Sequence, residues 1–256
     1  MNTKTLSTRA LSVIDQYLHF KAGEAVCSVP YFNNRRMQAR ATLRPLIGKG
    51  SPKDIFEEVQ AITVKSHASL NALADESLKK LLADNDIGID CSAFAYYVLN
   101  AESEEMKRGG LDKRLSFVNC HGLIGKIRCA LRPVENCDVA TLAHDKNSRV
   151  VSVKEVQPGD FITMLGGPDS NDRDHILVIH QVEYQNAVPT ALHYSHAVAY
   201  PEDGLYGSGI RQGVIEIVSP GGALLEQRWT EDGVAGKDNR IFVRAQKSRT
   251  EVRRLN

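Results

Sequence analysis

The sequence predicts an α+β domain with an antiparallel sheet, because helical patterns fill the first part of the chain and strand patterns the last. Up to about residue 105, apolar residues recur at the spacing of amphipathic helices. After Val150, short β-branched and aromatic runs are bounded by Gly, Pro, Asn and Asp. Helices followed by a run of strands are typical of this fold class. With 256 residues, 42% of them hydrophobic, the chain can bury a sizeable core, and we expect a single domain over residues 1–256.

Four helices are expected in the first part, over residues 3–22, 51–65, 69–82 and 91–105. The second has the clearest start, because Ser51 can cap it, Pro52 suits its first position and Asp54 adds an acid to its first turn. The first is expected to end at Gly23, since glycine favours a helix stop. Residues 111–149 show no single pattern.

Strands are expected over residues 150–153, 161–165, 175–182, 191–197, 213–218 and 240–245. The basic segment 247–254 is interpreted as solvated surface, because arginine runs usually face water. Trp229, the only tryptophan, is expected to pack in the core.

Composition gives no argument for a nucleic-acid or membrane partner, because the formal net charge is +1. No run of 18 apolar residues is present, and residues 1–22 lack the apolar core of a secretory signal. The five cysteines are odd in number and include no Cys-x-x-Cys pair, which favours reduced thiols over a disulfide framework. We therefore expect a cytoplasmic protein, with export by another route left open and no oligomeric state indicated.

Two further groups of residues suggest a ligand, but their spacing does not support one. Gly48-Lys49-Gly50 lacks the spacing and the trailing Ser or Thr of a phosphate-binding P-loop. Three cysteines and two histidines later in the chain match no usual zinc pattern; they are Cys120, His121, Cys129, Cys137 and His144. No metal and no cofactor is expected.

The clearest candidate for chemistry is Cys91, which follows Asp90 and opens an apolar helical pattern. In the first turn of a helix, unpaired backbone N–H groups and the helix dipole favour an anion such as a thiolate. A thiol in such a place can have its pKa lowered to roughly 3.5–7.5. The alternative is an inert cysteine buried at the start of a core helix.

A nucleophilic cysteine needs a base, and the base needs a group that orients it. His175 opens an apolar strand directly after a polar loop, and His196 lies in the next expected strand. Side chains alternate along a strand, so each of these histidines shares a face with apolar neighbours, whereas His180 and His193 point to the opposite face. This parity also counts against a histidine metal site.

Four short motifs, taken in order, resemble the NlpC family of papain-like cysteine peptidases, best known as bacterial cell-wall endopeptidases. They are Asp90-Cys91-Ser92-Ala93-Phe94, Pro158-Gly159-Asp160-Phe161-Ile162, His175-Ile176-Leu177-Val178-Ile179 and Tyr194-Ser195-His196-Ala197. The resemblance implies a papain-like fold, with the nucleophile at a helix N-terminus packed on an antiparallel sheet and with a helical insertion over about 51–83. Ala93 and Leu177 stand where the family usually has glycine.

The resemblance also implies the roles of single residues. Cys91 would be the nucleophile, His175 the base and His196 the orienting group, with His193 as the alternative for that third role. The oxyanion or substrate-binding positions would be Tyr31, Ser92 and Asp90.

The implied activity is hydrolysis of an amide bond through an acyl-enzyme, in a peptide or a small amide, with peptidoglycan-type peptides among the expected substrates. One alternative is a papain-fold protein that binds a ligand or partner without turnover. The other is a nucleic-acid or phosphate binder that uses the basic tail together with Arg35, Arg36, Arg40 and Arg44.

Overall fold

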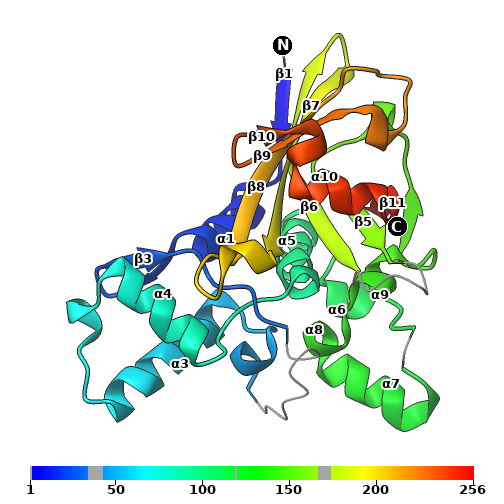
Figure 1. The fold of residues 1–256 in the computed structure, drawn as a ribbon. Helices are drawn as coiled ribbons and strands as arrows, with labels where there is room; N and C mark the ends of the chain where they lie inside the picture. Colours follow the sequence, from blue (N-terminus) through cyan, green and yellow to red (C-terminus); the bar gives the residue numbers. More distant parts are fainter. Residues whose placement is uncertain (1, 34–42, 119, 167–173) are drawn as a thin grey trace.

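The computed structural model describes residues 2–33, 43–118, 120–166 and 174–256, and its described part is a mixed α+β structure built on a large antiparallel sheet (Figure 1). The sheet order is β10-β9-β8-β7-β6-β5-β11-β4, and β1 adds to β6. Every pair of neighbours in it is antiparallel. The expected α+β class with an antiparallel sheet is therefore confirmed, whereas the papain-like assignment stays a prediction.

The strands are β1 (Asn2–Thr5), β2 (Phe20–Ala22), β3 (Ala25–Cys27), β4 (Ser148–Val150), β5 (Phe161–Leu165), β6 (His175–Gln185), β7 (Val188–Val198), β8 (Gly209–Glu216), β9 (Arg228–Glu231), β10 (Val234–Ala235) and β11 (Arg249–Leu255). The helices are α1 (Thr8–Leu18), α3 (Pro52–Lys65), α4 (Asp75–Asp84), α5 (Cys91–Glu105), α6 (Leu111–Arg114), α7 (Gly122–Leu131), α8 (Pro133–Asn136), α9 (Val139–Ala143) and α10 (Arg240–Gln246).

The long central strands β6 and β7 separate two hydrophobic cores. Ile176 and Val178 belong to the core that also holds α1 and α5. Leu177 and Ile179, which point the other way, belong to the core that holds α10 and the fully buried Trp229. The alternation along β6 therefore determines which face of the sheet each of its side chains lies on. The expected core position of Trp229 is confirmed.

Two of the four predicted helices match closely. α5 begins at Cys91, and α3 begins with a capping box in which Ser51 and Asp54 each accept a backbone hydrogen bond, at 3.1 and 2.9 Å. The helix predicted over 69–82 begins later, as α4. The helix predicted over 3–22 was too long at both ends, because β1 pairs with β6 and a short hairpin follows α1.

The predictions for the last part of the chain need three corrections. The strand predicted over 150–153 is wrong, because β4 ends at Val150 and Val153–Glu155 form a short 3-10 helix. Residues 240–245 form α10 and not a strand, with Asn239 as its N-cap and Ile241, Phe242 and Ala245 buried on one helical face. The segment 247–254 is not a solvated tail, because β11 lies inside the sheet between β5 and β4. Arg253 is buried there and binds Glu251 and Asp145, at 2.6 and 2.5 Å, which makes its charge acceptable in the interior.

The expectation that all thiols are reduced was also wrong, because Cys120 and Cys129 form a disulfide. Their Cα atoms lie 6.4 Å apart, since the helix α7 folds Cys129 back towards the segment before it. Cys27, Cys91 and Cys137 are free. Among the described residues, no group of three or more His, Cys, Asp and Glu side chains is arranged to hold a metal ion.

Candidate active site

The candidate nucleophile Cys91 is the first residue of α5, and Asp90 caps that helix. The Asp90 carboxylate accepts a hydrogen bond of 2.7 Å from the backbone N–H of Ala93, which satisfies one unpaired group of the first turn. Cys91 itself is 4% exposed. The predicted position of the thiol in the first turn of a helix is thus confirmed, in a more enclosed setting than the sequence suggested.

A buried lysine holds this helix start in place. Nζ of Lys49 lies 2.9 Å from Asp90 Oδ2 and 2.8 Å from Ser92 Oγ, and it also donates to the carbonyl of Cys137 at 3.1 Å. Ser92 in turn donates to Asp90 at 2.9 Å. The Asp90 and Ser92 side chains are therefore used within the fold, and a direct contact of either with substrate remains a prediction.

Gly48 permits the close approach that brings Lys49 to the helix. Its φ is +71°, and a Cβ at this position would lie 2.1 Å from the carbonyl oxygen of Phe32. Its own carbonyl accepts a hydrogen bond of 2.8 Å from the backbone N–H of Asp90. The Gly-Lys-Gly segment thus serves packing, and its lysine points inward and not towards a phosphate.

The pKa of Cys91 moves in the opposite direction from the one expected. Burial raises the pKa of the Cys91 thiol to about 11, and the neighbouring Asp90 carboxylate adds to the effect. Arg244, Lys49 and the backbone amide of Ile176 lower it only in part. The helix N-terminus does not lower the pKa of Cys91 below its usual value. The Asp90 carboxylate already occupies the positive end of the helix, and burial has removed water from the thiol.

The candidate base His175 belongs to a buried chain of three side chains from three strands. His175 Nε2 lies 2.7 Å from Nδ1 of His196 in β7. His196 Nε2 lies 2.7 Å from Oε2 of Glu231 in β9. His175 and His196 are 2% and 0% exposed. Strand alternation placed the two rings on one face, as expected, and the sheet added a carboxylate that sequence reasoning missed.

The carboxylate end of the chain is held by two tyrosines. Tyr200 and Tyr194 donate hydrogen bonds of 3.0 and 3.1 Å to the two oxygens of Glu231. Burial raises the pKa of Glu231, but its interactions with His196 and the two tyrosines outweigh this and lower it. Gly213 in β8 makes room for Tyr194, since a Cβ there would lie 2.2 Å from the tyrosine hydroxyl. Glu231 is therefore ionised and fixed.

An ionised Glu231 determines where the ring protons lie when both imidazoles are neutral. The carboxylate accepts, so His196 carries its proton on Nε2 and presents a lone pair at Nδ1. That lone pair accepts the Nε2 proton of His175, which leaves Nδ1 of His175 unprotonated. Burial, Arg244 and His196 lower the pKa of His175 well below its usual value, so the neutral ring is the resting form. With both rings neutral, Nδ1 of His175 is thus left able to accept a proton.

The fold brings the cysteine near the start of the strand that carries this histidine. The backbone amide of Ile176, the residue after His175, lies close enough to the Cys91 thiol to lower its pKa slightly. Arg244 of α10 acts electrostatically on both the Cys91 thiol and the His175 ring. The Cys91 thiol therefore lies near the start of β6, the strand that opens with His175. Among the described residues, the His175 ring has its hydrogen bond with His196 and none with the Cys91 thiol.

The other two histidines of these strands lie elsewhere. His193 Nε2 contacts Glu183 at 2.8 Å, and His180 Nδ1 contacts Ser195 at 3.0 Å. Of the two candidates for the third role, it is His196 and not His193 that contacts His175.

Tyr31 lies near the start of α5 by a backbone contact, and a role of its side chain in the site stays a prediction. It forms an isolated parallel bridge with Ile89, two residues before Cys91, although 60 residues of sequence separate Tyr31 from the cysteine. The amide of Phe32 donates to the carbonyl of Ile89 at 3.2 Å. The Tyr31 hydroxyl accepts a hydrogen bond of 3.4 Å from Asn33. The helices α3 and α4 fill the sequence between the two segments, in the range predicted for an insertion.

Sequence reasoning missed Glu231, Lys49 and Arg244. Glu231 stands in an ordinary strand pattern, and a buried carboxylate in it has no local signal. Lys49 was considered only as part of a phosphate loop. Arg244 lies in the segment predicted as a strand. Comparisons of the chain with protein-family models, with curated proteins and with solved structures found no match.

Proposed function

We propose that this protein is a cysteine-dependent hydrolase that cleaves an amide bond, with Cys91 as nucleophile and His175 as base. The observation that supports it is the buried chain from His175 through His196 to Glu231, beside a cysteine that opens a helix. Burying two imidazoles and a carboxylate costs stability unless each is paired. A fold that keeps such a chain, on a strand whose first residues lie near a thiol, is suited to proton transfer.

In the proposed reaction, Nδ1 of His175 accepts the proton of Cys91 while the sulfur bonds to the substrate carbonyl carbon. The backbone N–H of Cys91, which has no partner within its helix, stabilises the oxyanion. The C–N bond then breaks, the leaving amine takes the proton from His175, and a thioester remains. Water gives a proton to His175 and attacks the thioester; the acid leaves and the thiol regains its proton.

The raised pKa of Cys91 and the lowered pKa of His175 make a neutral thiol and a neutral imidazole the resting pair. Proton transfer therefore accompanies attack on the substrate. Peptides and small amides fit this chemistry, and peptidoglycan-type peptides are the first class to test. A cytoplasmic location remains a prediction; the disulfide between Cys120 and Cys129 is unusual for a reducing compartment.

A papain-fold protein that binds without turnover is the second candidate. It is favoured by the enclosure of Cys91 and His175, which are 4% and 2% exposed. The nucleic-acid alternative has less support among the described residues. Arg44 binds Glu135 at 3.0 Å, and Arg254 binds Asp160 at 2.6 Å. Arg35, Arg36 and Arg40 lie outside the described residues.

The test is to incubate the protein with peptidoglycan-derived peptides and with simple peptide amides, and to record products and intact protein mass. The hydrolase predicts new carboxyl products, a transient acyl adduct on Cys91 and loss of both in Cys91→Ala. Cys137→Ala, which removes another buried free thiol, is the matched control and should keep both. Product formed equally by Cys91→Ala would refute the proposal. Absence of product with every substrate, together with iodoacetamide labelling of Cys91 that His175→Ala leaves unchanged, would favour the binding protein.

A further inference from the structure

Helix α7 presents an apolar stripe that no described residue covers. Leu123, Ile124, Ile127 and Leu131 are 76%, 84%, 52% and 74% exposed. Leu123, Ile127 and Leu131 recur every four residues, and Ile124 lies next to them, so the four side chains form one stripe along the helix. Four large aliphatic side chains side by side on a protruding helix are more than scattered surface residues explain.

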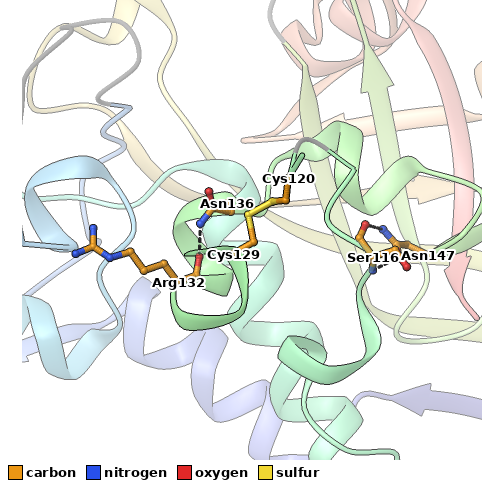
Figure 2. Close-up of a disulfide and its surroundings, with 6 residues drawn as sticks. All are labelled: Ser116, Cys120, Cys129, Arg132, Asn136 and Asn147. Carbon is orange, nitrogen blue, oxygen red and sulfur yellow. Dashed lines mark hydrogen bonds between the residues drawn. A yellow bond between two sulfur atoms is a disulfide. The ribbon is translucent and has the colours of Figure 1, made fainter. Parts of the chain in front are cut away.

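The disulfide determines which way this stripe points. Cys129 is the one buried residue of α7, and its bond to Cys120 ties the inner side of the helix to the segment before it (Figure 2). At 3.6 residues per turn, Cys129 lies about half a turn from the middle of the apolar stripe. At the helix end, Asn136 donates to the carbonyl of Arg132 at 2.7 Å. The stripe is therefore held facing outward.

The charged side chains of α7 itself, and of its C-cap residue, are all basic. Between Cys120 and Val134 the sequence holds Lys126, Arg128 and Arg132 and no Asp or Glu. By helical position, Lys126 and Arg128 flank the stripe on its two sides, and both are exposed. Carboxylates of α3 and Glu135 of α8 line a cavity with Leu131 and Arg132, at the far end of the helix. The first two turns of α7 thus combine an outward apolar stripe with basic flanks.

From this arrangement we propose that α7 is an interfacial helix by which the protein binds an anionic lipid surface. A helix with an outward apolar stripe and basic residues on both sides fits a bilayer surface. The apolar stripe can enter the boundary of the acyl chains, and Lys126 and Arg128 can contact lipid phosphates. A protein partner would instead need a matching groove. None of the described helices has the length and apolar character to cross a membrane, so contact through α7 is peripheral.

The overall charge of +1 gave no reason to expect a membrane partner, because that sum hides the local excess on α7. A single short helix binds weakly by apolar contact alone, so anionic lipid is expected to be necessary. The site is separate from Cys91, and the proposal does not depend on the proposed hydrolase.

The test is co-sedimentation of the full chain with vesicles of phosphatidylcholine alone or mixed with phosphatidylserine. We expect binding to the mixed vesicles only, weakened by added salt. Ile124→Ser is expected to lower the partition coefficient about tenfold, since an immersed isoleucine would be lost. The double variant Lys126→Glu, Arg128→Glu is expected to abolish binding. Val64→Ser on α3, which removes another exposed aliphatic side chain, is the control and should bind like the parent.

Three outcomes would overturn the proposal. The first is no binding to either vesicle. The second is equal binding by the parent and the α7 variants. The third is a concentration-dependent dimer in sedimentation velocity that Ile124→Ser abolishes, because the stripe would then be covered by a second copy. All variants lie on exposed positions, and circular dichroism checks that each is folded.

Discussion

Nε2 of His175 and Nδ1 of His196 lie 2.7 Å apart, so that two buried imidazoles from neighbouring strands share one hydrogen bond. This contact can orient the His175 ring only if the proton of His196 has a fixed position. Glu231 supplies it by accepting from the far nitrogen of His196. The orientation of the candidate base therefore depends on a residue 56 positions further along the chain (231 − 175).

Glu231→Gln is expected to release the fixed tautomer of His196, because an amide can donate as well as accept. In the parent, ring ¹⁵N spectra should show unprotonated Nδ1 in both His175 and His196. In the variant these signals should shift or broaden, and the proposed hydrolysis should slow by roughly 10²–10⁴. Glu183→Gln, which removes the partner of His193, is the control. Unchanged His196 signals in Glu231→Gln would contradict the proposed chain.

Lys49→Met is expected to lower the free energy of unfolding by about 3–5 kcal/mol, because it leaves the buried Asp90 carboxylate without its cation. Urea unfolding measures the change. Lys53→Met removes an exposed pair with Glu57 and should change stability by less than about 0.5 kcal/mol. The double variant Lys49→Met, Asp90→Asn should regain much of the loss, since asparagine caps helices without a charge. An equal effect of the two lysine variants would show that Lys49 carries no buried charge pair.

His180→Gln is expected to make the protein less sensitive to acid. Burial, with a contribution from His193, lowers the pKa of His180 to about 4. A lowered pKa means that the unfolded chain takes up the proton first, so stability is present above about pH 6.5 and is lost as the pH falls towards 4. Between pH 7.5 and 5 this one residue should remove roughly 2 kcal/mol of stability. His67→Gln, at an exposed position, controls for the substitution itself. Parallel losses in parent and His180→Gln, measured by urea unfolding, would contradict this assignment.

Cys91→Ala is expected to make the protein less sensitive to alkali. Burial raises the pKa of Cys91 to about 11, so its contribution to stability is complete below about pH 9 and is lost as the pH rises through 11. Between pH 8 and 10.5 the parent should lose roughly 2 kcal/mol more than the variant. Thiolate absorbance gives a second measurement, since one step near pH 11 should vanish in Cys91→Ala. A step that vanishes near pH 7 would instead indicate an activated thiol.

Local patterns predicted the elements that carry the candidate nucleophile and base. The start of α5 at Cys91 followed from a polar capping residue before an apolar helical run. The shared face of His175 and His196 followed from the two-residue period of strands. These signals are short-range, so they can be read without knowing which segments meet. The same local patterns led to the wrong prediction of a strand at α10 and of a surface tail at β11. The structure of these two segments depends on packing against residues far away in the sequence.

The sequence by itself determined the α+β class, the helix start at Cys91 and the strand parity of the two histidines. Only the tertiary structure decided that Glu231 completes the histidine chain, that Lys49 neutralises Asp90, that Cys120 meets Cys129, and that the Cys91 pKa rises. The physical reason is that pairing and loss of water depend on groups far apart in the sequence. A capping motif places a thiol at a helix start, but only the surrounding fold determines whether water reaches it.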